Sequence, residues 1–299
     1  MTPTHLRSFV VPFMLATLVA CQKPKAEPTT ESSPSATAES TPTAPAQPAA
    51  NPGAPIDPGA LYALDTDPQP APPPSSGLAR VLKGLHLRVC VRADAAPFGA
   101  FASGGLEGFE IELAREIVQT ISIDYKQALR PEWTVVTAGE RMKRLQDDGC
   151  DLMIASFSHT PERANELALS KVYLRTDKVL LAQQKVTRKV PIIAKVGGTT
   201  GGDSAGVKGT ERTFGSYQEI VYAMDMDEID YLVTDRPIAE HLIRSSTRPF
   251  VVQKTIAEGA ESYVAATAKT NPELLAAVDR ALETLARSGR LAHLHRRWL

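Results

Sequence analysis

Hydroxyl groups, a predicted helix start and an arginine follow one another between Ser156 and Arg163, a combination that could hold a small anion. Ser156 and Ser158 can donate to a carboxylate or accept from an ammonium. Thr160 and Pro161 indicate the start of a helix, where free backbone N–H groups and the positive end of the helix dipole favour an anion. Arg163 adds a planar group that can bind a carboxylate through two donors. These groups suit the main-chain end of a free amino acid; alternatively, Thr160 only caps a helix and Arg163 pairs with a surface acid.

The segment before these residues, Leu152 to Ala155, is a short apolar run typical of a strand buried on both faces. Upstream, apolar runs and helical spacing predict strands at 85–92 and 134–137 and helices at 108–121 and 140–147. Alternating strands and helices of this length predict a parallel sheet covered by helices. Ligands bind such sheets at the carboxyl ends of the strands, where Arg92, Thr137 and Ser156 stand.

A second group of strands and helices follows along the chain. A strand at 179–184 is expected to cross to this second group, and the segment 258–266 is expected to cross back. Ser216 begins a capping-box pattern, which predicts a helix start. A further strand, predicted at 229–233, ends shortly before Asp235.

The first residues of the chain predict a secretory signal and a lipid anchor. A short basic region precedes an apolar stretch at 9–20 that is too short to span a bilayer. The sequence Leu-Val-Ala directly before Cys21 resembles the bacterial lipobox, which implies a signal peptide at 1–20 and lipid on Cys21 after cleavage. An ordinary signal with an incidental cysteine is the alternative.

Residues 22–77 hold fourteen of the 23 prolines, and the remainder is mostly Ala, Thr, Ser and Glu without a hydrophobic period. Such a segment buries too little apolar surface to offset the entropy of ordering. We therefore predict that 21–77, lipidated at Cys21, is a disordered tether that is partly extended in polyproline form.

Charge and cysteine usage narrow the function classes. The net charge is -1 and no basic patch stands out, so nucleic-acid binding is not indicated. No cysteine, histidine or acidic spacing indicates a metal, and no cofactor is expected. Cys90 and Cys150 are predicted to lie buried in one sheet as small apolar residues, with a disulfide between them as the alternative in an oxidising compartment.

The segments 87–117, 140–174, 233–243 and 271–299 occur in the order and roughly the spacing of a known family. They resemble the extracytoplasmic solute-binding proteins of family 3, the polar-amino-acid binders of ABC importers. The resemblance implies the type II periplasmic-binding-protein fold, in which two α/β lobes, each a sheet covered by helices, are joined by a two-strand hinge. It places lobe 1 at 78–182 and 262–299, and lobe 2 with the hinge strands at 183–261.

The family resemblance also suggests site residues in lobe 2. A Gly-Thr-Thr turn after a strand supplies backbone N–H groups to the ligand carboxylate in the family, and the match falls on Gly198, Thr199 and Thr200. Asp235 falls where the family places the carboxylate that receives the ligand ammonium. A simple glycine turn and a helix cap are the respective alternatives. The glycine-rich segment 201–209 stands where family members carry a helix, so lobe 2 is expected to be shortened.

Two arginines indicate which class of side chain the expected ligand carries. Arg92 falls where glutamate and aspartate binders carry an arginine, and Arg141 falls on a second such position. Ala95 and Ala138 stand where binders of basic amino acids and glutamine usually carry aromatic residues. Two guanidinium groups without an aromatic clamp suit a side-chain carboxylate. Each arginine could instead be a solvated residue at a rim.

The resemblance implies a monomeric, lipid-anchored binding protein on the periplasmic or cell-surface side of a bacterial membrane. It would capture a polar amino acid, predicted to be acidic, between two closing lobes and deliver it to an ABC-transporter permease. An enzyme on the same fold, similar to cyclohexadienyl dehydratase, is one alternative, with Asp94 or Glu140 as its acid. A sensor or scaffold at the cell surface is the other.

Overall fold

The computed structural model describes residues 68–183, 186–200, 206–246, 249–256 and 259–299. The predicted signal peptide, Cys21 and most of the predicted tether lie outside the described residues. The end of the predicted tether makes regular contacts: Gln69 donates its backbone N–H to the carbonyl of Asp124 at 2.9 Å, and Ser76 caps helix α2, Gly77–Gly84. The folded part therefore begins earlier than residue 78, because these backbone groups find partners in the first lobe.

The first lobe is built on a mixed five-stranded sheet with the order β5-β1-β6-β13-β7. Its strands are β1 His86–Val91, β5 Arg130–Val135, β6 Leu152–Met153, β7 Leu167–Thr176 and β13 Glu261–Ala268. β1 runs parallel to β5 and β6, as the alternation of strands and helices predicted. β13 runs antiparallel to β6 and β7, so the returning segment completes the sheet.

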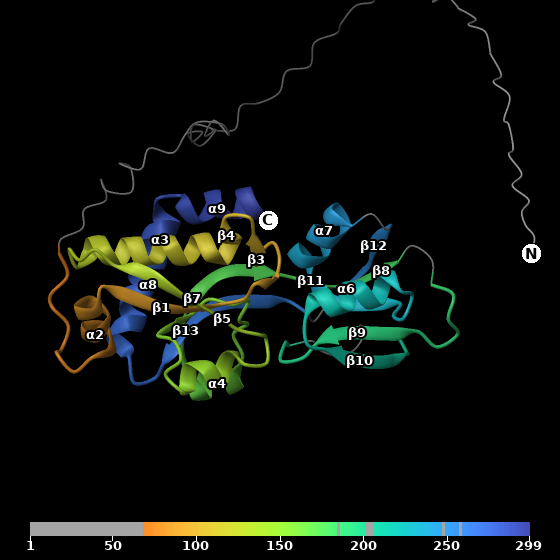
Figure 1. The fold of residues 1–299 in the computed structure, drawn as a ribbon, viewed down its shortest axis with the longest axis horizontal. Coiled ribbons are helices and arrows are strands. Elements are labelled where there is room, and N and C mark those ends of the chain that lie inside the picture. Colours follow the sequence, from red (N-terminus) through yellow and green to blue (C-terminus); the bar gives the residue numbers. More distant parts are fainter. Residues whose placement is uncertain (1–67, 184–185, 201–205, 247–248, 257–258) are drawn as a thin grey trace, which may run out of the picture. The chain divides into compact units, whose positions relative to one another are not determined.

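Helices cover both faces of this sheet (Figure 1). One face carries α3 Phe109–Asp124, α8 Pro272–Arg287 and α9 Arg290–Trp298, and the other carries α4 Arg141–Gln146. The alternation of side chains along β1 explains the two faces: Leu87 and Val89 join the core under α3, while Cys90 joins the smaller core under α4. The predicted inward face of α3 is fully buried at Phe109, Leu113, Ile117 and Ile121.

The second lobe is built on another mixed five-stranded sheet with the order β10-β9-β11-β8-β12. Its elements are β8 Lys178–Gln183, β9 Ile192–Val196, β10 Thr210–Phe214, α6 Tyr217–Asp225, β11 Tyr231–Asp235, α7 Arg236–Ser245 and β12 Phe250–Thr255. β9 is parallel to β10 and β11, and β8 is antiparallel to β11 and β12. The chain is thus an α/β protein of two lobes, as predicted.

The connection between β9 and β10 spans 197–209, and its described residues, 197–200 and 206–209, contain no helix. A small three-stranded sheet adds to the first lobe and consists of β2 Asp94–Ala95, β3 Gly99–Ala102 and β4 Gly105–Glu107.

Two segments connect the sheets, one between β7 and β8 and one between β12 and β13. They pair with each other: Lys178 donates its backbone N–H to Gly259 at 3.0 Å, and Ile256 donates to the carbonyl of Lys178 at 2.9 Å. The first crossing lies at 176–178, before β8, whereas lobe 1 was expected to continue to 182. The run from Val179 to Ala182 is fully apolar and buried, so its sequence fits the centre of either sheet.

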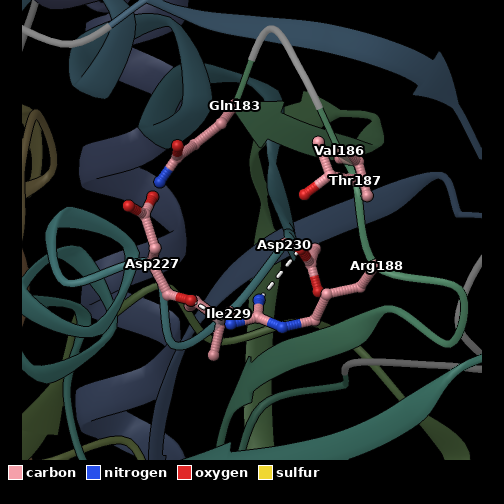
Figure 2. A pocket seen from close by; sticks show the side chains of 7 residues that line it. All are labelled: Gln183, Val186, Thr187, Arg188, Asp227, Ile229 and Asp230. Carbon is pink, nitrogen blue, oxygen red and sulfur yellow. Dashed lines mark hydrogen bonds and ion pairs between the residues drawn. The ribbon is translucent and has the colours of Figure 1, made fainter.

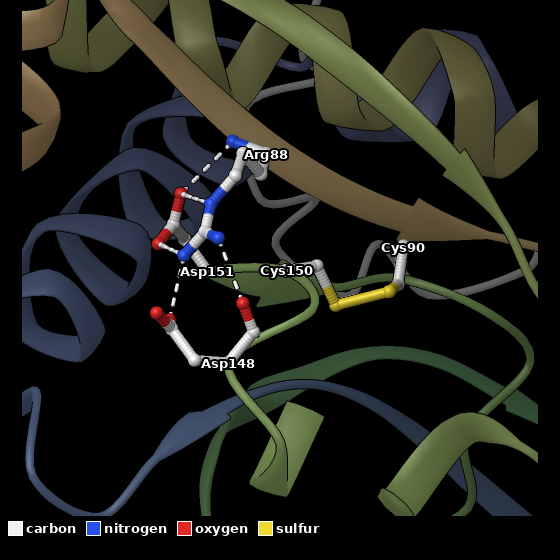
Figure 3. The surroundings of a disulfide bond; sticks show 5 residues. All are labelled: Arg88, Cys90, Asp148, Cys150 and Asp151. Atoms are coloured by element: carbon white, nitrogen blue, oxygen red, sulfur yellow. Dashed lines mark hydrogen bonds and ion pairs between the residues drawn. A yellow bond between two sulfur atoms is a disulfide. The ribbon is translucent and has the colours of Figure 1, made fainter. Parts of the chain in front are cut away.

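Cys90 and Cys150 form a disulfide with their Cα atoms 5.8 Å apart (Figure 3). The expectation of two unpaired buried cysteines was wrong, and the alternative holds. β1 and β6 are parallel neighbours with Cys90 opposite Met153, and Cys150 lies two residues before β6 begins, so the pairing of the strands brings the two cysteines close. Beside the disulfide, Arg88 donates to Asp151 at 2.7 Å and to Asp148 at 2.6 Å, which joins the same two chain segments a second time.

Candidate functional site

The segment after β6 forms the helix start that the sequence predicted. The hydroxyl of Thr160 accepts the backbone N–H of Arg163 at 3.2 Å, and Pro161 opens α5, Pro161–Glu166. The Arg163 side chain folds back, donates to the carbonyl of Ser158 at 2.8 Å, and lies 4.1 Å from the ring centroid of Phe157. Its guanidinium is therefore buried and held in one orientation by its own segment.

Glu110 of α3 accepts hydrogen bonds from this segment, and the sequence analysis did not identify it. It is 1% exposed and accepts the backbone N–H of Ser156 at 2.7 Å, the Ser156 hydroxyl at 3.2 Å and the Tyr173 hydroxyl at 2.6 Å. Burial raises the pKa of Glu110 although these hydrogen bonds oppose the rise. No sequence signal identifies it, because a glutamate in the first turn of a helix is ordinarily a partner of the helix dipole.

The hydrogen bonds of the Arg141 side chain go to backbone carbonyl oxygens. Its guanidinium is 1% exposed and donates to four of them: Ala138 at 2.9 Å, Ala155 at 2.8 Å, Ser156 at 2.5 Å and Gly198 at 2.7 Å. Burial, together with repulsion from Arg92 and Arg163, lowers the pKa of Arg141 to about 9. The side chain therefore stays charged at neutral pH and ties the first lobe to the turn of the second.

Arg92 forms a two-contact ion pair with Asp94. Its Nε and Nη2 atoms donate to the two carboxylate oxygens at 2.8 and 2.7 Å, and its guanidinium carbon lies 5.3 Å from the ring centroid of Tyr217. Arg92 is 1% exposed, so this pair is a buried part of the strand end and not a solvated rim residue. Asp94 borders two cavities of about 350 and about 310 Å³, and Gln218 of α6 borders both of them as well.

The turn after β9 requires glycine. Gly198 has φ +78°, and a Cβ atom there would lie 2.6 Å from the Cα atom of Gly139 in the first lobe. The carbonyl of Gly198 accepts from Arg141 at 2.7 Å and from Arg163 at 3.4 Å. The Thr199 hydroxyl donates to the carbonyl of Val196 at 2.7 Å, within its own turn.

Thr200 lies against residues that the sequence analysis did not single out. Its hydroxyl donates to Glu261 at 2.7 Å, accepts from Lys178 at 2.9 Å, and lies 3.3 Å from the hydroxyl of Ser158. Lys178 and Glu261 also form an ion pair with each other, and both are buried. Lys178 and Glu261 begin β8 and β13, and no sequence motif at these positions indicated a role in the site.

Asp235 ends β11 directly before α7, but its side chain makes no capping hydrogen bond. One carboxylate oxygen accepts the hydroxyl of Tyr263, which lies on β13 of the first sheet. The other oxygen, Oδ1, is buried and has no hydrogen-bond partner in the described part of the chain. Burial raises the pKa of Asp235 above its ordinary value. A buried carboxylate oxygen without a donor is suited to a ligand that carries N–H groups.

The structure thus brings most of the predicted ligand residues together where the first and second lobes meet. Arg141 and Arg163 share the carbonyl of Gly198, and Ser158 meets Thr200. Arg92 is close enough to Asp235 and Glu110 to affect the pKa of each. Cys21, the predicted lipid attachment residue, lies outside the described residues.

A further cavity of about 330 Å³ lies on the second lobe and contains none of the predicted site residues (Figure 2). It is lined by Gln183, Val186, Thr187, Arg188, Asp227, Ile229 and Asp230. Arg188 crosses it to donate to Asp230 at 3.0 Å, so these two charges are paired with each other.

Within the described residues, no group of three histidine, cysteine or acidic side chains could hold a metal ion. Likewise, none of the helices placed by the structure combines the length and apolar character needed to cross a bilayer.

Comparison with known proteins assigns the family. Residues 87–299 match the bacterial extracellular solute-binding proteins, family 3. The ABC transporter glutamine-binding protein GlnH of Bacillus subtilis is 26% identical over 223 residues, which cover 70% of this chain and 79% of that protein. The arginine-binding extracellular protein ArtP of the same organism is 23% identical over 219 residues, 69% of this chain and 83% of that protein.

Among solved structures, the solute receptor for L-cysteine of Neisseria gonorrhoeae superposes with a TM-score of 0.67 at 21% identity, over 74% of this chain and 93% of that one. This likeness extends to the two-lobed periplasmic-binding-protein fold. The family and the curated relatives are binding proteins by name, so the chain is a binding protein and not an enzyme. It belongs to the bacterial extracellular solute-binding proteins, family 3.

Proposed function

We propose that this protein captures a polar amino acid between its two lobes and delivers it to an ABC importer. The observation that carries the proposal is the pair formed by Arg163 and Asp235. Arg163 is a buried guanidinium aimed by its own segment, and Asp235 has a buried carboxylate oxygen without a donor. The first lies in the first lobe and the second in the second lobe. An α-carboxylate and an α-ammonium are the groups that such a pair would bind.

The main-chain end of the ligand would lie among the residues already described. Arg163 and the hydroxyl of Ser158 would receive the carboxylate, together with backbone N–H groups of the Thr199 and Thr200 turn. The Ser156 hydroxyl would join them by exchanging Glu110 for the ligand as its acceptor. Asp235 would receive the ammonium. The ligand would then contact both lobes at once and bind the closed form more tightly than the open form, which shifts the population toward closure. The closed form would dock on the permease.

We further propose that the preferred ligand has an acidic side chain, with Arg92 and Arg141 as the cations that attract it. Asp94 already holds two donors of Arg92, and the donors of Arg141 go to carbonyls. An acidic side chain would therefore compete with Asp94 for Arg92. The names of the relatives, a glutamine binder and an arginine binder, make the amide and the basic side chain the competing choices.

We also propose a lipid anchor at Cys21 and a location on the outer side of a bacterial membrane. The sequence around Cys21 and the proline-rich segment after it support this proposal. Mass spectrometry of the membrane-extracted protein would detect a lipidated N-terminal cysteine, and an unmodified mature N-terminus elsewhere would disprove the anchor.

A thermal-shift screen of residues 22–299 tests the ligand. A ligand at 100 times its dissociation constant adds about 2.7 kcal/mol of stability. We expect L-glutamate or L-aspartate to raise the melting temperature by several degrees. A shift with L-glutamine or L-arginine alone would keep the amino-acid binder and reject the acidic preference. No shift with any amino acid would reject the binder and favour a sensor or scaffold.

Substitution of Asp94 tests whether Arg92 attracts the side chain of the ligand. Asp94→Asn frees Arg92 from its ion pair, so affinity for L-glutamate should increase. Asp148→Asn is the matched control, because Asp148 also pairs with an arginine, Arg88, but is exposed and lies beside the disulfide. Equal effects of the two substitutions on affinity would show that the Arg92–Asp94 pair does not face the ligand.

A further inference from the structure

Lys178 and Glu261 occupy matching places at the hinge. Lys178 begins β8 directly after the first crossing, and Glu261 begins β13 directly after the second. Their side chains form a buried ion pair, with 7% of each residue exposed. The backbone of Lys178 also pairs with that of the other crossing, through Gly259 and Ile256. The ion pair thus lies at both crossings and joins the two sheets.

This ion pair has a third member, Thr200. The ammonium of Lys178 donates to Glu261 and to both the hydroxyl and the carbonyl oxygen of Thr200, which uses all three of its donors. The Thr200 hydroxyl donates its own hydrogen bond to the Glu261 carboxylate at 2.7 Å. Hydrogen bonds from Lys178 and Ser158 keep the pKa of Glu261 below its ordinary value although burial opposes this. The carboxylate is therefore charged and fully engaged at neutral pH.

Thr200 and the start of β8 at Lys178 belong to the second lobe, whereas Glu261 and Ser158 belong to the first. The hydrogen bond from Thr200 to Glu261 and its 3.3 Å contact with Ser158 therefore join the two lobes, and a rotation that parts the lobes at this point would break them. Contacts that differ between two arrangements are the ones that set their relative population.

We propose that Lys178 and Glu261 are positioning residues that dock Thr200 at the hinge and thereby set the closed geometry of the cleft. They act through Thr200 and not by touching the ligand. The inference uses the proposed amino-acid function only where ligand affinity is measured. The docking itself can be measured on the protein alone.

Hydrogen–deuterium exchange of residues 22–299, read on peptides that cover 197–200 and 156–158, tests the docking. Lys178→Met should increase exchange of both peptides and leave the α8 peptide unchanged. Thr200→Val removes the hydroxyl contacts with Lys178 and Glu261 without leaving a buried charge, so it should increase exchange of the same peptides if Lys178→Met folds poorly. Lys195→Met is the matched control, because it removes a second-lobe ion pair, with Glu211, that is partly exposed and lies between β9 and β10.

A double-variant cycle separates positioning from general hinge support. If Lys178 acts through Thr200, Lys178→Met should cause less additional exchange in a Thr200→Val background than in wild type, because only its bond to the Thr200 carbonyl is left to lose. With L-glutamate as the probe, each single variant should weaken binding by a factor within the usual range of allosteric coupling, about 5- to 150-fold. Additive effects, or unchanged exchange at 197–200, would overturn the inference. Failure of wild type to bind L-glutamate would reject the proposed ligand but leave the exchange result to decide the docking.

Discussion

The two walls of the candidate site are held in different ways. In the first lobe, Ser156 is supported by Glu110, and Arg163 is fixed by Thr160 and by the carbonyl of Ser158. All of these partners belong to the same lobe. The first wall is thus organised before any contact with the second lobe is made, which is the condition for precise binding geometry.

The second wall takes its support from elsewhere. Gly198 is held by Arg141, Thr200 by the hinge pair, and Asp235 by Tyr263 of the first sheet. Apart from Lys178, which begins β8, these supports belong to the first lobe. The comparison suggests that the first lobe offers a prepared surface and that closure assembles the second, a division common in hinge-closing proteins.

The largest expected effect is on ligand affinity when the first wall loses its cation. Arg163→Ala should weaken binding of the amino acid by about 2–5 kcal/mol, because one partner of a buried charge pair is removed and the ligand carboxylate is left unpaired. Calorimetric titration measures the loss, and circular dichroism checks that the fold is intact. Affinity within twofold of wild type would remove Arg163 from the site.

Loss of the disulfide should affect stability of the first lobe and spare the second. The bond closes a chain separation of 60 residues. Loop-closure entropy for that length corresponds to about 4 kcal/mol. In residues 22–299, the Cys90→Ala/Cys150→Ala variant should therefore show early melting of the first lobe in calorimetry, with the unsubstituted protein as the control. A melting temperature equal to that of the control would contradict the prediction.

Substitution of the second-lobe turn should affect closure more than stability. Gly198→Ala forces an L-residue to φ +78° and places its Cβ 2.7 Å from the carbonyl oxygen of Ala138. The left-handed conformation alone costs about 1–2 kcal/mol, and we expect most of this as lost ligand affinity. Gly104→Ala is the control, since a Cβ there meets nothing within 4 Å. Equal affinities for the two variants would show that the turn does not contribute to closure.

The smallest effect is a pH dependence of binding through Asp235. The ligand ammonium binds the charged carboxylate, and burial raises the pKa of Asp235, so protonation competes with binding at a higher pH than for an ordinary aspartate. Affinity should therefore decrease as the pH falls through this raised pKa and be constant above it. Titrations between pH 4 and 8 test this against Asp235→Asn, which should bind weakly at every pH. A wild-type profile without a decline would contradict the assignment.

Local features of the fold were predictable from the sequence. The cap at Thr160, the capping box at Ser216 and the helices α3 and α8 follow from residue types a few positions apart. The position of Arg163 after a buried strand follows as well. These features depend on short-range rules, which a single sequence contains in full.

The sequence alone determined the α/β class and the first-wall segment, because periodicity and caps are written along the chain, and its resemblance to a known family implied the two lobes. Only the tertiary structure decided that Arg92 pairs with Asp94, that Cys90 bonds Cys150, and that Glu110 supports Ser156. It also decided that β8 joins the second sheet and that Lys178, Glu261 and Thr200 meet. Partners of this kind are distant in the sequence, and a charged or apolar residue has many possible partners until folding brings one of them within bonding distance.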